Sequence, residues 1–194
     1  MTPTDRPRLG AVLLTGGTSV RLDGVDKASL EIGGKTLLER GLEALTEAED
    51  VVVVGAEVPT SRPVTFRRED PPGDGPAAGV LAGLDGFAGR PDLVVVLAVD
   101  MPWVTTDTVR RLRGAVAADG AQLVDGDGNR QHLCGIYRTS ALLDRAASLG
   151  DEHGVSMRRL LAGLDLGEVP ESEGESRDVD TWADVQAVRE QFAD

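Results

Sequence analysis

The residues best suited to chemistry lie in the segment LTGGTSVRLDGVDK, which runs from Leu14 to Lys27 after the apolar run that starts at Leu9. Adjacent glycines and a polar run containing Gly24 break the periodicity of both strands and helices, so the segment is predicted to be a loop. Glycines let a backbone approach a ligand closely and expose its N–H groups to an anion. Arg21 and Lys27 add positive charge. The pattern therefore predicts a phosphate-binding loop after a buried first strand.

Two common phosphate motifs do not describe this loop. A dinucleotide fingerprint needs G-x-G-x-x-G at the start of a helix, and Gly16-Gly17-Thr18-Ser19-Val20 does not supply it. A Walker loop needs G-x-x-x-x-G-K-[ST], whereas two residues separate Gly24 from Lys27 here and Ala28 follows the lysine. The interpretation that remains beside a phosphate loop is a glycine-rich surface loop without a ligand.

A carboxylate follows the longest apolar run of the chain. Asp100 comes directly after Leu93 to Val99, and Pro102 then ends the predicted strand. In open α/β sheets the ligand lies at the carboxyl ends of the strands. Mg²⁺ prefers one or two carboxylates together with phosphate oxygens and water. We therefore predict that Asp100 holds Mg²⁺, while a cap or turn role before the next helix stays open.

Two further carboxylates are candidates on less evidence. Asp180 precedes the last predicted helix and is interpreted either as a second metal ligand or as the helix N-cap, with Thr181 as the first helical residue. Asp70 ends the third predicted strand ahead of Pro71, where its carboxylate could accept a hydrogen bond from a ribose hydroxyl or a base.

Length and composition limit the class of protein. The chain has 194 residues, which fits a single α/β domain over residues 1–194 with one substantial core. No apolar run approaches the ~20 residues that cross a bilayer, and the polar start from Met1 to Arg8 lacks the core of a signal peptide. We therefore expect a cytoplasmic protein without a membrane partner. The lone Cys134 fits a reducing compartment and is interpreted as a buried strand residue.

The charge balance is strongly acidic. A formal net charge of −13 argues against a nucleic-acid partner, which would require a basic face. The surplus acid, including the segment from Glu168 to Asp180, is expected to coat the outside of the protein. Lys27, as a loop cation, is expected to be exposed and to contribute little to stability.

Strand-like and helix-like segments alternate along the chain. This alternation predicts an α/β fold in which a mostly parallel sheet carries helices on both faces. Thr36 with Glu39 is typical of a capping box at a helix start. The predicted strands are 9–14, 51–54, 64–67, 93–99, 121–124, 131–137 and 166–169, and the predicted helices are 36–48, 77–87, 106–118, 141–149, 156–162 and 181–192.

These motifs, in their order along the chain, resemble the molybdenum cofactor guanylyltransferase family. The loop matches the pattern L-x-G-G-x3-R-x4-D-K of that family. The later matches are weak individually and specific as a set; they are Glu69-Asp70, Gly75-Pro76-Ala77-Ala78-Gly79, Val99-Asp100-Met101-Pro102, His132-Leu133-Cys134-Gly135-Ile136-Tyr137-Arg138 and Asp178-Val179-Asp180-Thr181.

The resemblance implies a three-layer Rossmann-like nucleotidyltransferase fold. It implies transfer of GMP from GTP to the terminal phosphate of molybdopterin, with release of pyrophosphate, Mg²⁺ as cofactor, and maturation proteins of molybdoenzymes as partners. The implied catalytic residues are Arg21, Lys27 and Asp100, and the implied metal ligands are Asp100 and Asp180. The implied nucleotide contacts are Leu14, Thr15, Gly16, Gly17, Lys27, Asp70 and Asp100.

The chain also departs from the family pattern. Thr15 replaces the usual Ala of the family, and Leu22-Asp23 replaces the usual Met-Gly. Gly55-Ala56 lacks the Asn that is frequent after the second strand, and Pro76-Ala77-Ala78 replaces Pro-Leu-Ala. The open alternatives are a related enzyme that transfers CMP or uses a sugar 1-phosphate, and a non-catalytic nucleotide-binding domain of the same fold. Candidate contacts to the acceptor are Arg130, Gln131, His132, Arg158 and Arg159.

Overall fold

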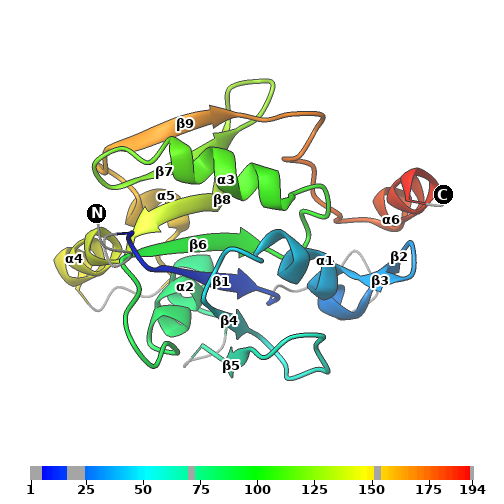
Figure 1. Ribbon diagram of the computed structural model, residues 1–194, viewed down its shortest axis with the longest axis horizontal. Helices are drawn as coiled ribbons and strands as arrows, with labels where there is room; N and C mark the ends of the chain where they lie inside the picture. Colours follow the sequence, from blue (N-terminus) through cyan, green and yellow to red (C-terminus); the bar gives the residue numbers. More distant parts are fainter. Residues whose placement is uncertain (1–5, 17–24, 70–72, 151–153, 193–194) are drawn as a thin grey trace.

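The computed structural model describes residues 6–16, 25–69, 73–150 and 154–192. Helices cover both faces of one central sheet, so the molecule has three layers (Figure 1). The predicted three-layer α/β architecture is confirmed.

The central sheet has seven strands in the order β5-β4-β1-β6-β8-β7-β9. Only β8 among them runs antiparallel to its neighbours β6 and β7, so the sheet is mostly parallel, as predicted. Its strands are β1 (Leu9–Leu14), β4 (Asp50–Val54), β5 (Thr65–Arg67), β6 (Leu93–Ala98), β7 (Gly120–Val124), β8 (Arg130–Arg138) and β9 (Leu166–Pro170).

The two central parallel strands, β1 and β6, are buried along their whole length. Strands of this kind read as continuous apolar runs because both faces of a parallel sheet are covered. Successive side chains point to opposite faces, so Ala11 and Leu13 enter one core, whereas Val12 and Leu14 enter the other. Strand β1, which precedes the predicted loop, is therefore held by both hydrophobic cores.

The helices divide between these two cores. The first core receives α1 (Leu37–Ala44), α3 (Thr106–Gly114) and α6 (Trp182–Gln191). The second receives α2 (Pro76–Leu84), α4 (Thr139–Leu149) and α5 (Met157–Leu160). In Figure 1 the arrowheads of β1 and β6 point to the side of the molecule where α6 lies.

Several helices end earlier than predicted. The predicted helix over 36–48 ends at Ala44, and the one over 106–118 ends at Gly114. Thr36 caps α1 as predicted, because its side chain accepts a hydrogen bond from the Glu39 backbone. The Glu39 carboxylate instead binds the backbone and hydroxyl of Ser61, so the reciprocal half of the capping box is absent. A tertiary contact has replaced the local one.

Sequence reasoning missed a short hairpin beside the loop. Strand β2 (Glu31–Ile32) pairs with β3 (Lys35–Thr36) in an antiparallel ladder. The turn between them is Gly33-Gly34, and both residues have positive φ. A Gly-Gly pair between two short runs is a recognised hairpin signal, so the sequence contained the information.

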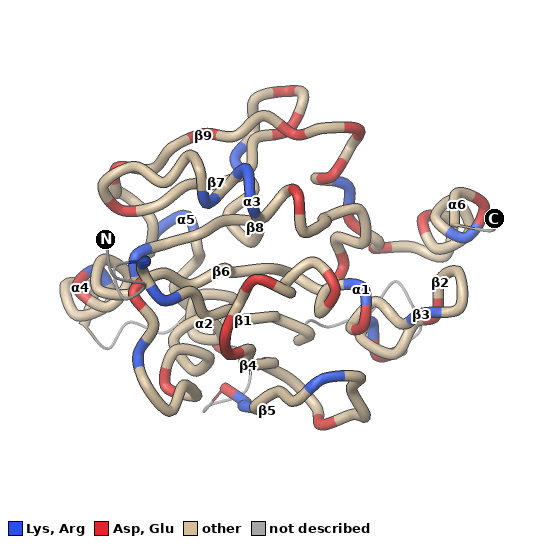
Figure 2. Tube along the Cα trace, viewed as in Figure 1, with Lys and Arg blue, Asp and Glu red and all other residues tan. Residues whose placement is uncertain are grey.

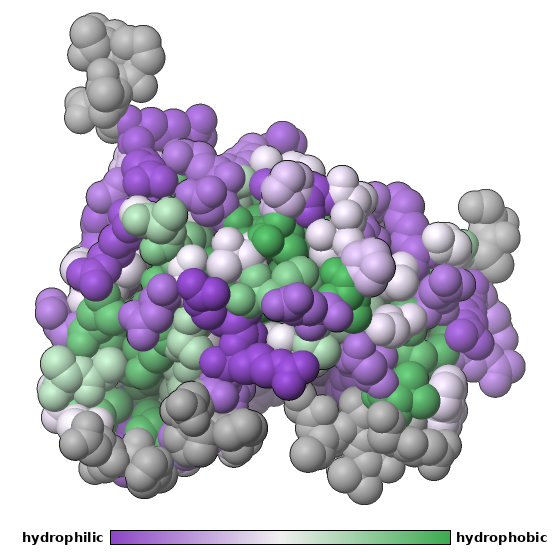
Figure 3. Space-filling model, turned by 90° about the horizontal axis from the view of Figure 1, so that it is seen from below, coloured by the Kyte–Doolittle hydropathy of each residue, from purple (hydrophilic) through white to green (hydrophobic). Residues whose placement is uncertain are grey.

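Acidic residues are spread along the whole trace (Figure 2). Hydrophilic side chains also run across the face seen from the β5 side, with smaller hydrophobic areas between them (Figure 3). The prediction that the 168–180 segment coats the outside is wrong for Glu175, which is 7% exposed. Within the part of the chain that the structure describes, no helix combines the length and hydropathy of a membrane span.

Candidate active site

A cavity of about 890 Å³ opens where several strands end. It lies at the carboxyl ends of β1, β4 and β6 and is closed by the start of α2, the start of α5 and part of β8. This volume is in the upper part of the ~300–1,000 Å³ range of small-molecule sites. The sequence-predicted residues in its lining are Leu14, Thr15, Gly16, Lys27, Asp100, Gln131, His132 and Arg158.

The last residues of the predicted phosphate loop, Val25 to Lys27, belong to the described structure. Lys27 opens a short 3-10 helix, η2 (Lys27–Ser29), whose N-cap is Asp26. The Asp26 carboxylate accepts hydrogen bonds from the Ala28 backbone and the Ser29 hydroxyl. Asp26 therefore fixes the backbone that presents Lys27.

The ammonium group of Lys27 binds two carboxylates. Its Nζ atom lies 2.9 Å from Asp100 Oδ2 and 2.5 Å from Asp180 Oδ1. The backbone N–H of Val179 donates to the Asp100 carbonyl, which draws the end of the chain against the end of β6. The structure therefore brings together three residues that are 73 and 153 positions apart in sequence.

The expectation that Lys27 is an exposed cation is wrong. Its side chain is 14% exposed, because it crosses from η2 into the space between the two carboxylates. Burial by itself lowers the pKa of Lys27, but the hydrogen bonds and charges of Asp180 and Asp100 outweigh it, so the pKa is raised. The lysine is therefore charged throughout the physiological pH range.

A third carboxylate joins this group. Asp178 lines the cavity, and desolvation together with the negative charges of Asp180 and Asp100 raises its pKa. Removal of a proton from Asp178 adds charge where charge is already concentrated. The cavity thus gathers negative potential around one lysine, an arrangement suited to a cation-bound polyanion.

Asp180 does not cap the last helix. The N-cap of α6 is Thr181, which forms a capping box with Asp184. Asp180 lies one residue earlier, and its carboxylate binds Lys27 instead. The capping interpretation of Asp180 is therefore wrong, and the predicted helix over 181–192 is confirmed as α6, Trp182–Gln191, with Thr181 as its N-cap.

The segment that carries these carboxylates is anchored by two other acidic residues. Glu175 accepts hydrogen bonds from the Thr108 hydroxyl, the Arg111 guanidinium and the Ser172 backbone. Glu171 accepts from Ser176 and from the backbone of Gly126. Acidic residues that looked like surface charge in the sequence therefore tie the segment 171–178 to α3 and to the β7–β8 turn.

A divalent ion fits the carboxylate pair. No group of three or more His, Cys, Asp and Glu side chains placed to hold a metal occurs within the described ranges. Asp100 and Asp180 nevertheless converge on one cation, and hard oxygen ligands of this kind suit Mg²⁺, which takes one or two carboxylates and completes its shell with phosphate and water.

Some predicted residues fall elsewhere. Gly17, Arg21 and Asp70 lie outside the described residues. Arg130, at the exposed start of β8, forms an ion pair with Glu168 of β9. Cys134 is a free, buried strand residue as predicted, and burial raises the pKa of its thiol to about 12.

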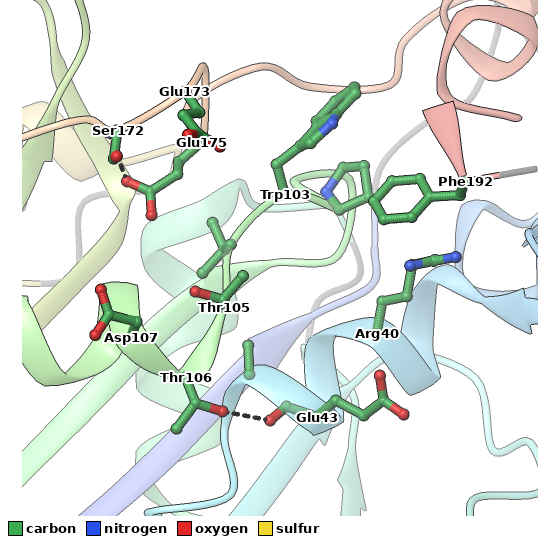
Figure 4. Close-up of a pocket in the computed structure, with 13 residues that line it drawn as sticks. Arg40, Glu43, Trp103, Thr105, Thr106, Asp107, Ser172, Glu173, Glu175 and Phe192 are labelled. Atoms are coloured by element: carbon green, nitrogen blue, oxygen red, sulfur yellow. Dashed lines mark hydrogen bonds between the residues drawn. The ribbon is translucent and has the colours of Figure 1, made fainter. Parts of the chain in front are cut away.

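A second cavity of about 540 Å³ lies between α1, the start of α3 and the end of α6 (Figure 4). The Arg40 guanidinium lies 3.9 Å from the centre of the Phe192 ring, and that ring lies 6.5 Å from Trp103. Trp103 also donates from Nε1 to the Gln191 side chain. These contacts hold the end of α6 against α1 and against the segment that precedes α3. They therefore also restrain the segment before α6, which carries Asp180.

Comparison with known proteins identifies the group to which the fold and cavity belong. The family model of the MobA-like NTP transferase domain matches residues 11–169. A molybdenum cofactor guanylyltransferase of Cereibacter sphaeroides is 37% identical over 150 residues, which are 73% of this chain and 75% of that protein. A probable molybdenum cofactor guanylyltransferase of Mycobacterium bovis is 35% identical over 172 residues, 84% of this chain and 83% of that protein.

Solved structures agree with this result at the level of the fold. Molybdopterin-guanine dinucleotide biosynthesis protein A from Archaeoglobus fulgidus has a TM-score of 0.70 at 24% identity and covers 95% of this chain and 98% of its own. The 2-C-methyl-D-erythritol 4-phosphate cytidylyltransferase from Thermus thermophilus has a TM-score of 0.66 at 23% identity, covering 94% and 98%. The resemblance inferred from the motifs is confirmed by the family match and by the curated relatives: the chain belongs to the MobA-like NTP transferase family.

Proposed function

We propose that this protein transfers GMP from GTP to the terminal phosphate of molybdopterin and releases pyrophosphate. The observation that carries the proposal is the contact of Lys27 with both Asp100 and Asp180 beside Leu14, Thr15 and Gly16, at one end of a cavity large enough for a nucleotide. The names of the curated relatives support the choice of GTP and of the acceptor.

The reaction requires little proton transfer by groups of the protein. A phosphate monoester is ionised at neutral pH and attacks the α-phosphorus without a strong general base, while pyrophosphate leaves on the opposite side. Catalysis then consists of holding two polyanions in line and neutralising their charge. Lys27, with Arg21 and the amides of the loop, is assigned to the leaving pyrophosphate side.

Asp100, together with Asp180, is assigned to Mg²⁺. Bound there, the ion would neutralise phosphate oxygens and so lower the charge that the attacking anion meets. The Lys27 ammonium lies between the same two carboxylates, so an ion bound there would share them with the lysine. With the ion held by these carboxylates, the charged Lys27 beside them would neutralise a phosphate oxygen of the nucleotide.

Two further assignments complete the proposal. The protein acts in the cytoplasm, and its product is passed to maturation proteins of molybdoenzymes. The first rests on the single cysteine of the chain, which fits a reducing compartment, and the second on the resemblance to the molybdenum cofactor guanylyltransferase family.

The test is a thermal-shift series with GTP, CTP, ATP and UTP, each with and without Mg²⁺, followed by an assay of pyrophosphate release with molybdopterin. A ligand that binds only the folded state stabilises it by about 2.7 kcal/mol at a hundredfold excess over its Kd. We expect the largest shift with GTP and Mg²⁺ and loss of turnover in Asp100→Asn. A larger shift with CTP would favour a cytidylyltransferase, and nucleotide binding without turnover would favour a non-catalytic domain.

A further inference from the structure

Strand β8 bulges where it meets the cavity. Gln122 of β7 pairs with Gly135, whereas the next residue, Leu123, pairs with Gln131. Residues 132–134 of β8 therefore have no partners of their own on β7. Bulges of this kind bend a strand and redirect a side chain, and they are frequent next to active sites. The first residue of the bulge is His132, which lines the cavity.

A buried tyrosine holds the bulge in place. The Tyr137 hydroxyl donates to the His132 carbonyl at 2.9 Å, from a side chain with 0% exposure. A Cβ at Gly135 would lie 2.6 Å from that hydroxyl, so only glycine leaves room for the ring to reach back. Burial raises the pKa of Tyr137, which keeps the phenol protonated as a donor. Gly135 and Tyr137, which belong to the motif from His132 to Arg138, therefore fix the backbone conformation at His132.

A buried amide holds the ring of the same histidine. The His132 Nδ1 atom lies 3.0 Å from Oε1 of Gln122, a residue that is 2% exposed. An amide oxygen only accepts hydrogen bonds, so the ring proton is assigned to Nδ1. Burial, with the positive charges of Arg130 and Arg158, lowers the pKa of His132. The ring is therefore neutral at pH 7, and Nε2 keeps its lone pair.

We infer that His132 uses Nε2 to accept a hydrogen bond from an uncharged N–H or O–H group of the acceptor substrate, and that Gln122 is the positioning residue that sets this tautomer. The inference rests on the proposed function and on the candidate acceptor contacts predicted from the sequence, of which Gln131, His132 and Arg158 line the cavity from β8 and α5. The substrate class is a nitrogen heterocycle with a ring or amino N–H, such as a pterin. A lone pair repels a phosphate dianion, so the geometry assigns His132 to the ring system of the acceptor.

The tautomer can be tested without any substrate. The chain has two histidines, so His153→Gln leaves a protein in which His132 gives the only imidazole ¹⁵N signals. We expect the Nδ1–H tautomer in this background and a shift toward the Nε2–H tautomer in Gln122→Leu. Gln131→Leu is the matched control, because Gln131 bonds Asp125 rather than the histidine, and it should leave the tautomer unchanged. An Nε2–H tautomer with Gln122 in place would overturn the inference.

The ligand class is tested on the same signals. Neopterin monophosphate should shift the Nε2 resonance while the ring stays neutral, and inorganic phosphate alone should leave it in place. Protonation of the ring by inorganic phosphate would overturn the inference and make His132 an anion contact. In turnover assays, Gln122→Leu and His132→Gln should raise the KM for the acceptor about tenfold, the value of one hydrogen bond, with the KM for GTP unchanged.

These readouts separate the two proposals. If GTP neither stabilises the protein nor is consumed, the proposed function fails, while the tautomer and the response to the pterin still decide the role of His132. If GTP is used normally and the Nε2 signal ignores the pterin, only the role of His132 fails.

Discussion

The side-chain oxygen of Thr15 lies 1.8 Å from the point where a Cβ at Gly55 would stand. The Thr15 hydroxyl is held near Gly55 because it donates to the Val54 carbonyl at 3.1 Å. The backbone N–H of Thr15 donates to the same carbonyl. Two departures from the family pattern, Thr15 and Gly55, are therefore one feature: the threonine fills the space that a larger residue at position 55 would need. Both line the cavity, at the carboxyl ends of β1 and β4.

This contact predicts strong coupling between the two positions. Gly55→Ala should reduce the free energy of unfolding by about 1–3 kcal/mol, because the new methyl group collides with the threonine. Thr15→Ala/Gly55→Ala should recover most of that loss, since the collision is gone. Urea denaturation of the two single variants and the double variant gives the coupling energy, and additive effects would contradict the contact.

Lys27→Met should lower turnover by a factor of about 10² or more, because the proposed function assigns this cation to the leaving pyrophosphate. It should also reduce the free energy of unfolding by about 1–2 kcal/mol, since Asp100 and Asp180 lose their shared donor. Steady-state kinetics and chemical denaturation measure the two effects.

Lys35→Met is the matched control for this variant. Lys35 also forms an ion pair, with Glu43, but the two side chains are 50% and 55% exposed. Its loss should change stability by less than about 0.5 kcal/mol and leave turnover unchanged. Equal effects of the two variants on turnover would remove Lys27 from the catalytic group.

Asp178→Asn should stabilise the metal-free protein at pH 7. The folded-state pKa of Asp178 lies above its unfolded value near 3.8, so ionisation above that pH costs folding free energy. The gain from the amide should shrink as the pH falls through the folded pKa and vanish below about 3.8. Melting temperatures of both proteins in EDTA across this range test it, and a difference that does not change with pH would contradict it.

Glu175→Ala should reduce the free energy of unfolding by about 3 kcal/mol, because it leaves Arg111 and the Thr108 hydroxyl without their carboxylate. Amide exchange should rise over the segment 171–178, which Glu175 ties to α3. Glu173→Gln, on an exposed neighbour in the same turn, is the control and should do neither. If the two variants exchange alike, the segment is held by other contacts.

The sequence alone determined the scaffold and the chemistry of single positions. The apolar runs at β1 and β6 are continuous because both faces are buried, so their residues predicted buried parallel strands. Asp100 could be placed at a strand end because a strand, a carboxylate and a proline follow one another locally. The Thr181–Asp184 capping box is equally local, and it set the start of α6 correctly.

Only the tertiary structure decided which groups meet. Lys27 and Asp180 are 153 positions apart, and no periodicity or spacing relates them; packing of α6 against the first core brings them together. The same holds for Glu175, which looks like surface acid until α3 supplies Thr108 and Arg111. Local patterns predict the secondary structure and burial of each segment, because these depend on neighbouring residues. The partner of a charged side chain depends on how the whole chain folds. For that reason the sequence could suggest Lys27, Asp100 and Asp180 as candidates, and only the structure shows that they contact one another.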